Sequence, residues 1–258
     1  MKKTLQIANF LGLIITIFIN YLSNTGAIAG KTIADVSDKN ANLFTPAGYA
    51  FIIWGVIYLG LLGFVIYTGR SLFSKKPDND DSVERIGWWF LISCIANSLW
   101  VIVWLQQELL LSVVIMIVAL FSLLKIIVNL NMEMDFHPLK KYLLIYWPFA
   151  IYAGWLSVAL IADVSAWLTS IGWSGWGISS ETWANILYAV AMLVNIYMIW
   201  NRNLREFAAV GVWALIAVGV ANKTNSTLYY CALIFAAIIF VNIVIHTARS
   251  KGRNAGRM

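Results

Sequence analysis

Eight apolar segments of membrane-spanning length constrain this chain more than any other feature. A helix rises about 1.5 Å per residue, so about 20 residues cross the roughly 30 Å of hydrocarbon in a bilayer. With 61% hydrophobic and 12% charged residues among 258, a soluble domain has too little interior to bury these segments. The sequence therefore predicts an all-α, polytopic membrane helix bundle. The segments cover residues 5–22, 47–69, 86–105, 109–130, 142–162, 183–200, 206–221 and 226–247, the seventh being the shortest.

The distribution of positive charge predicts the orientation of the bundle. If the N-terminus is cytoplasmic, fourteen Lys and Arg residues fall on the inner side and three on the outer side, Lys31, Lys39 and Lys223. Lys125 lies within the fourth segment and is expected to extend its amine toward the inner surface. Because cytoplasmic loops are rich in Lys and Arg, we predict that both termini are cytoplasmic, in the plasma membrane of a bacterium. The net charge of +6 then needs no nucleic-acid partner.

The first thirty residues allow a second interpretation. A basic start, an apolar run and an Ala-x-Ala site at 27–29 are also typical of a cleaved secretory signal. Cleavage would leave seven helices and an exterior N-terminus. The apolar run is longer than the about 7–15 residues of a typical signal, which favours retention of the first helix.

Polar or reactive residues in the arrangements that catalysis needs are scarce. Cys94 and Cys231 lie within apolar runs, and His137 and His246 have no companions at metal-ligand spacing. The chain contains no Gly-rich phosphate loop, nucleophile elbow or HExxH pair. We therefore predict no metal site and no catalytic residues, and leave open whether the protein is an enzyme.

Aromatic residues and one amide converge near the outer ends of three segments. Trp54 lies eight residues, about 12 Å, below Pro46 at the outer mouth of the second segment, and Trp155 lies eight residues below Asp163, at the outer end of the fifth. In the third segment, Asn97 lies about 13 Å and Trp100 about 9 Å below the outer turn. These side chains are thus expected at similar depths.

Helical spacing places seven residues of the second and fifth segments, including Trp54 and Trp155, on two stripes. One stripe contains Phe51, Trp54 and Tyr58, and the other Tyr152, Trp155, Ala159 and Asp163. A cavity walled by such rings, with Asn97 as a hydrogen-bonding group and space beside Ala159, would suit a flat apolar ligand. The alternative is that the rings only pack helix against helix and that Asn97 joins two helices.

At these residues the sequence resembles the TspO/MBR family of tryptophan-rich sensory proteins and translocator proteins. The stretch "FTPAGYAFIIWGVIY" is similar to the family's "FSPP-W-F-VW-LY" pattern, although Ala47 replaces a proline, Tyr49 stands where Trp is common and Trp54 falls one residue early. Asn97 and Trp100 match an Asn-x-x-Trp motif. Residues 152–163 match Tyr-x-x-Trp-x-x-x-Ala-x-x-x-Asn, with Asp163 in place of Asn.

The resemblance implies a five-helix TspO-like domain over residues 1–163, followed here by a three-helix extension over 164–248 and a basic cytoplasmic tail over 249–258. It implies a pocket that is covered by the polar loop 23–45 and binds a porphyrin, another tetrapyrrole or a sterol-like molecule, in sensing or transport. The implied ligand-binding residues are Phe51, Trp54, Tyr58, Asn97, Trp100, Tyr152, Trp155, Ala159 and Asp163.

Other functions and partners stay open at this level. A small-solute or lipid transporter is ranked second because the segments show no convincing repeat and almost no midplane charge. A porphyrin- or lipid-modifying enzyme is ranked third. A retinal protein is disfavoured because the last segment has no lysine. Membrane lipid is an expected partner, and the small residues Ala150 and Gly154 leave a homodimer open.

Overall fold

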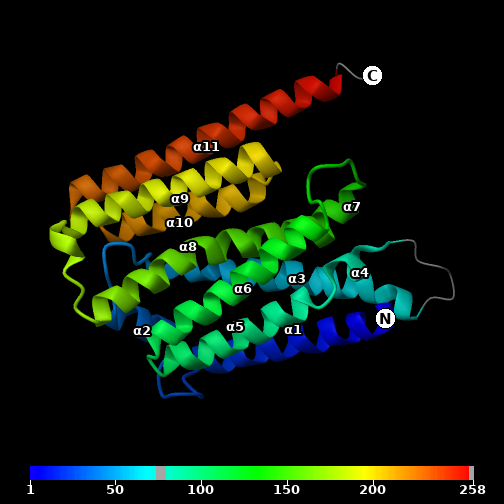
Figure 1. Cartoon of the computed structure of the whole chain (residues 1–258), viewed down its shortest axis with the longest axis horizontal. Coiled ribbons are helices and arrows are strands. Elements are labelled where there is room, and N and C mark those ends of the chain that lie inside the picture. The colour runs from blue at the N-terminus through cyan, green and yellow to red at the C-terminus, as the bar shows by residue number, and fades with distance from the viewer. Residues whose placement is uncertain (74–79, 256–258) are drawn as a thin grey trace.

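The computed structural model describes residues 1–73 and 80–255, and every regular element in those ranges is a helix (Figure 1). A long helix occupies each predicted segment. These helices are α1 (Lys2–Asn24), α3 (Ile53–Gly69), α5 (Trp89–Leu105), α6 (Leu109–Asn129), α8 (Trp147–Ser170), α9 (Ser180–Arg202), α10 (Arg205–Ala221) and α11 (Ser226–Ala255).

Shorter helices extend or connect the long ones. They are α2 (Ile33–Lys39), the 3₁₀ turns η1 (Gly48–Ile52), η2 (Arg70–Leu72) and η4 (Gly175–Gly177), α4 (Ser82–Ile86), α7 (Leu139–Lys141) and the π-helical turn η3 (Tyr142–Tyr146). With its flanking turns, α3 becomes the continuous helix Gly48–Leu72, and α8 becomes Leu139–Ser170.

Six helices in the described ranges are long and apolar enough to cross a membrane. They are α1, Gly48–Leu72, α6, Leu139–Ser170, α9 and the part of α11 up to Arg249. The other two predicted spans, α5 and α10, are regular helices of 17 residues each. The predicted fold class, an all-α polytopic membrane bundle, is confirmed.

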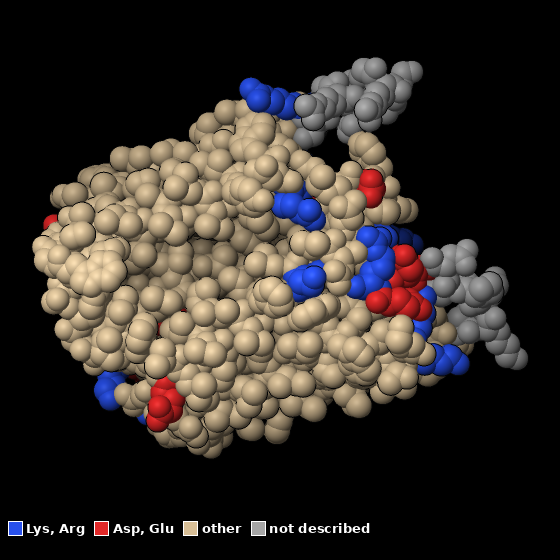
Figure 2. Space-filling view, viewed as in Figure 1, with Lys and Arg blue, Asp and Glu red and all other residues tan. Residues whose placement is uncertain are grey.

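The helices lie side by side, with α8 between two groups (Figure 1). On one side α8 packs against α6 and α3, and α1 packs against α5. On the other side α8 packs against α10, which packs against α9 and α11. Both termini lie at the same end of the bundle, and α2 lies at the opposite end (Figure 1). On the face shown in Figure 2, most charged side chains gather at the end that carries the termini.

The end of α8 differs from the prediction. The fifth segment was predicted over residues 142–162, with Asp163 at its outer end. The helix instead continues to Ser170, with the hydroxyls of Ser165, Thr169 and Ser170 bonded back to carbonyl groups of their own helix. Asp163 therefore lies about two turns inside the helix rather than at its outer end.

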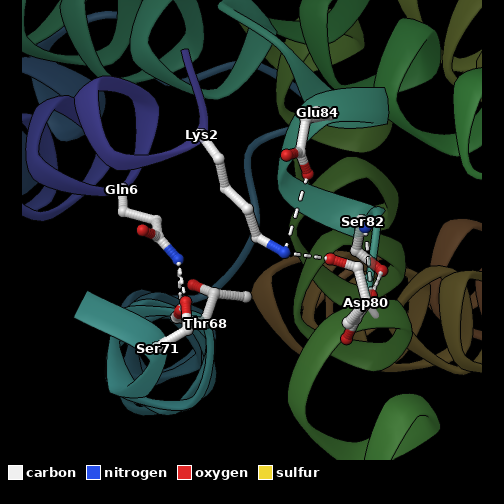
Figure 3. Close-up of polar contacts among 7 residues, drawn as sticks. All are labelled: Lys2, Gln6, Thr68, Ser71, Asp80, Ser82 and Glu84. Carbon is white, nitrogen blue, oxygen red and sulfur yellow. Dashed lines mark hydrogen bonds and ion pairs between the residues drawn. The ribbon is translucent and has the colours of Figure 1, made fainter. Parts of the chain in front are cut away.

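Side-chain contacts attach the start of α1 to the neighbouring loops (Figure 3). Gln6 Nε2 donates a hydrogen bond to the carbonyl oxygen of Thr68, 2.7 Å away. Lys2 Nζ donates to the carbonyl oxygen of Asp80 and lies 3.8 Å from the carboxylate of Glu84. The first helix is thus joined by polar contacts to the ends of α3 and α4.

The crossing of α8 and α10 depends on a glycine. A Cβ atom at Gly154 would lie 2.6 Å from the carbonyl oxygen of Phe207 and 3.1 Å from its Cα. Backbone atoms cannot move aside as a flexible side chain can, so only glycine permits this approach. The sequence left open whether Gly154 contacts a second copy of the chain. In the structure it makes a close contact with α10 of the same chain.

We predict that Gly154→Ala destabilises the bundle by about 1–3 kcal/mol, because α10 must shift away from α8. A lower Tm in detergent would be the measured result. Gly55→Ala is the matched control, since a Cβ at that helical glycine meets nothing within 4 Å. An equal Tm for Gly154→Ala and Gly55→Ala would contradict the proposed role of the crossing.

A polar cluster joins α9, α10 and α11 to the connection between α6 and α7. Asn203, in a left-handed conformation after α9, donates from Nδ2 to the carbonyl oxygen of Glu133, 3.0 Å away. His246 Nε2 lies 3.1 Å from Asn203 Oδ1, and Arg205 lies 3.9 Å from the Glu133 carboxylate. Burial, with a smaller contribution from Glu206, raises the pKa of Glu133 from 4.5 to about 7, against the opposing effect of Arg205.

The raised pKa of Glu133 predicts a pH-dependent stability. The folded protein retains a proton that the unfolded chain has lost between pH 4.5 and about 7, so stability falls as the pH rises through that window. We expect Glu133→Gln to reduce this loss in the free energy of unfolding by about 1–2 kcal/mol, after allowance for solvent screening. Thermal unfolding between about pH 5 and 8 measures this slope. Glu108→Gln, at an exposed carboxylate, should leave the slope unchanged.

Candidate functional site

A cavity of about 60 Å³ is lined in part by residues of α2. Figure 1 shows α2 at the end of the bundle opposite the termini. The walls of the cavity come from α2, the turn before α3, α3 itself, α5, α6 and α8. Six of the nine predicted ligand-binding residues line it, namely Phe51, Trp54, Trp100, Trp155, Ala159 and Asp163. Pro46, at the mouth of the second predicted segment, also lines it.

Aromatic rings from three helices form most of the wall. Phe51 contacts Trp155 edge to face, with ring centroids 6.0 Å apart and planes at 80°. Trp100 stacks on Trp104 at 5.5 Å and 20°. Ala159 lies one turn from Trp155 and leaves space beside the ring. The cavity therefore has flat apolar surfaces on the α3, α5 and α8 sides.

The other three predicted residues lie behind this wall rather than in it. Trp54 stacks on Tyr58, with centroids 5.4 Å apart, and contacts Tyr152 edge to face at 5.7 Å. Tyr152 interacts with the side chain of Asn97. Asn97 Oδ1 accepts a hydrogen bond of 2.9 Å from Asn20 Nδ2 on α1. Tyr58 and Tyr152 thus contact the ring of Trp54, and Asn97 joins α5 to α1 and α8.

The lid predicted over residues 23–45 contains a folded helix, α2. The hydroxyl of Thr32 accepts from the backbone N–H of Asp35, and the Asp35 carboxylate accepts from the N–H of Thr32. This capping box starts the helix, and its backbone and side-chain hydrogen bonds lower the pKa of Asp35. Ile33, Ser37 and Asn40 face the cavity.

Two hydrogen bonds attach α2 to the end of α5. Trp104 Nε1 donates to the carbonyl oxygen of Ile33, 3.2 Å away, and Lys39 Nζ donates to Gln107 Oε1, 2.5 Å away. Ile33 and Val36 bury their side chains against the same region of α5. The cover of the cavity is thus a short amphipathic helix held by a few contacts.

Asp163 is the charged residue of the cavity. It is 2% exposed, and its two carboxylate oxygens accept hydrogen bonds from two different helices. Trp100 Nε1 on α5 donates to Oδ2 at 3.0 Å, and Ser112 Oγ on α6 lies 2.7 Å from Oδ1. This residue therefore connects α5, α6 and α8 at the cavity wall.

Sequence reasoning missed several lining residues. Trp104 follows Trp100 by four residues, and this spacing alone indicates that both rings share a face. Met116 on α6 and Ala162 and Ala166 on α8 also line the cavity. No feature of the sequence distinguishes these three from ordinary apolar helix residues.

The fold and this cavity define a helical membrane protein with an aromatic pocket. Residues 6–245 match the model of a family described as TSPO-like protein. The match covers most of the chain, and the chain therefore belongs to that family, as the three motifs indicated. It begins within α1 and continues through α9, α10 and most of α11. No curated protein and no solved structure matches the chain.

We predict that Trp104→Phe loosens α2 without removing its apolar contacts, because the variant loses only the donor to the Ile33 carbonyl. A lost hydrogen bond of about 1 kcal/mol corresponds to roughly fivefold faster amide exchange in α2. Hydrogen–deuterium exchange over residues 33–39 measures this change. Trp89→Phe makes the same substitution at the other end of α5 and should leave α2 exchange as in the wild type.

Proposed function

We propose that this TspO-like membrane protein binds a hydrophobic ligand, a tetrapyrrole such as a porphyrin or a sterol-like molecule, in the cavity under α2, in a sensory or transport-related role. The observation that carries the proposal is that Trp54, Trp100 and Trp155, from three helices, line one cavity. Indole faces bind planar apolar ligands with large contact area and little loss of side-chain entropy.

The size of the cavity adds a requirement to this proposal. Pockets for drug-sized ligands have volumes of roughly 300–1,000 Å³, so a cavity of about 60 Å³ holds only a small group. A larger ligand must displace part of the cover. The segment suited to move is α2, which has seven residues, is attached by two side-chain hydrogen bonds and exposes Ala34, Asp35, Asp38 and Lys39.

The position of the cavity supports an outward-facing site. It is lined in part by α2, which lies at the end of the bundle opposite both termini, and the positive-inside asymmetry favours cytoplasmic termini. In a bacterial plasma membrane the ligand would then reach the cavity from the exterior or from the outer leaflet.

A titration with protoporphyrin IX tests the proposal. We expect saturable binding to the wild type in lipid nanodiscs and at least roughly tenfold weaker binding to the double variant Trp54→Phe, Trp155→Phe, because two ring faces of the cavity shrink. Quenching of tryptophan fluorescence and the shift of the porphyrin absorption band provide two independent measurements.

The matched control is the double variant Trp173→Phe, Trp176→Phe. It removes the same number of indoles from the connection before α9, outside the cavity lining. Equal affinity of both double variants would show that the porphyrin binds elsewhere on the protein, and absence of saturation in the wild type would refute a porphyrin ligand.

A further inference from the structure

The chemical character of the cavity is set by one side chain. Among the described residues that line it, Asp163 is the one ionisable group, and the remainder are aromatic, aliphatic or neutral polar residues. Unlike these residues, the Asp163 carboxyl group can hold a full negative charge.

The hydrogen bonds of Asp163 leave this charge without a cationic partner. Trp100 and Ser112 are both neutral donors, and within the described ranges no Lys, Arg or His forms an ion pair with Asp163. The Ser112 hydroxyl has a single proton and two acceptors at 2.7 Å, the carboxylate and the carbonyl oxygen of Leu109. A carboxylate also offers about four acceptor positions, so it can accept further bonds.

A buried carboxylate of this kind is costly unless a positive charge compensates it. The surroundings of Asp163 would also stabilise a cation in another way, because an ammonium group binds to the face of an indole ring. Trp100 donates to Asp163 and lines the cavity together with Trp104 and Trp155. A protonated amine placed beside the carboxylate would therefore contact both its counter-charge and aromatic faces.

We propose that the cavity selects ligands that carry a protonated amine, which pairs with Asp163 among the indole rings, and discriminates against ligands that present a carboxylate there. This inference rests on the proposed function, since it assigns the charge of the ligand bound in the same cavity. Asp163 is then a specificity-determining residue as well as a link between three helices.

Three ligands with one macrocycle test the charge preference. They are protoporphyrin IX as the free diacid, its dimethyl ester, and its diamide with ethylenediamine, which carries two protonated amines. Each is titrated into wild type, Asp163→Asn and Asp38→Asn in nanodiscs of zwitterionic lipid, so that the lipid supplies no net charge. Asp38→Asn makes the same substitution at an exposed residue of α2 outside the cavity lining.

The wild type should bind the diamine at least about tenfold more tightly than the diacid, with the ester between them. In Asp163→Asn the ratio should fall to within about threefold, whereas Asp38→Asn should keep the wild-type ratio. The asparagine retains an acceptor for Trp100 and a similar volume, so the variant tests charge with little change of packing.

The two proposals fail in different ways. A diacid that binds the wild type as tightly as the diamine overturns the charge selection by itself, even if Asp163→Asn does not fold. An unchanged ratio in folded Asp163→Asn has the same meaning, and the proposed function then stands. If none of the three ligands saturates the wild type, the proposed function fails together with this inference.

Discussion

The absence of water from the hydrocarbon core governs most of this structure. Polar side chains inside the bundle have to find partners on their own or neighbouring helices. Asn20 on α1 bonds to Asn97 on α5, and Thr16 on α1 contacts the carbonyl oxygen of Cys94 and the hydroxyl of Ser98. Asp163 on α8 accepts hydrogen bonds from Trp100 on α5 and Ser112 on α6. The polar contacts thus fix how α1, α5, α6 and α8 are rotated against one another, and this rotation brings the tryptophans to one cavity.

Sequence reasoning located the helices because apolar length is a strong signal, and it failed where that signal was mixed. The fifth segment was predicted to end at 162, but α8 continues through Ser165, Thr169 and Ser170. Each hydroxyl donates a hydrogen bond to a carbonyl oxygen in the preceding turn of the helix, so these residues do not end α8. The short helix α2 was missed although Thr32 and Asp35 have capping-box spacing, because it lies within a polar segment without a long apolar repeat.

For the cavity, depth along the membrane was more informative than helical phase. Depth placed Trp54 and Trp155 together, and both line the cavity. It also placed Asn97 there, but depth does not specify the direction in which a helix faces, and Asn97 turns toward α1. Helical phase placed Phe51, Trp54 and Tyr58 on one face. Phe51, however, lies in the 3₁₀ turn η1, where the rotation per residue differs from that of the α-helix that follows, so one α-helical spacing does not describe all three. The resemblance to a known family supplied the ligand class, which no spacing in the chain determines.

The close crossing at Gly154 has a consequence for how α8 meets its surroundings. On one side α8 faces the cavity and the helices α3, α5 and α6, and on another Gly154 contacts the backbone of α10. As a result, 61% of the membrane-spanning window of α8 is buried, whereas only 22% of the α11 window is buried. Lipid tails adapt to any apolar side chain, whereas a neighbouring helix accepts only a matching shape. The sequence of α11 can therefore change as long as it stays apolar, whereas α8 is constrained by shape over more than half of its window.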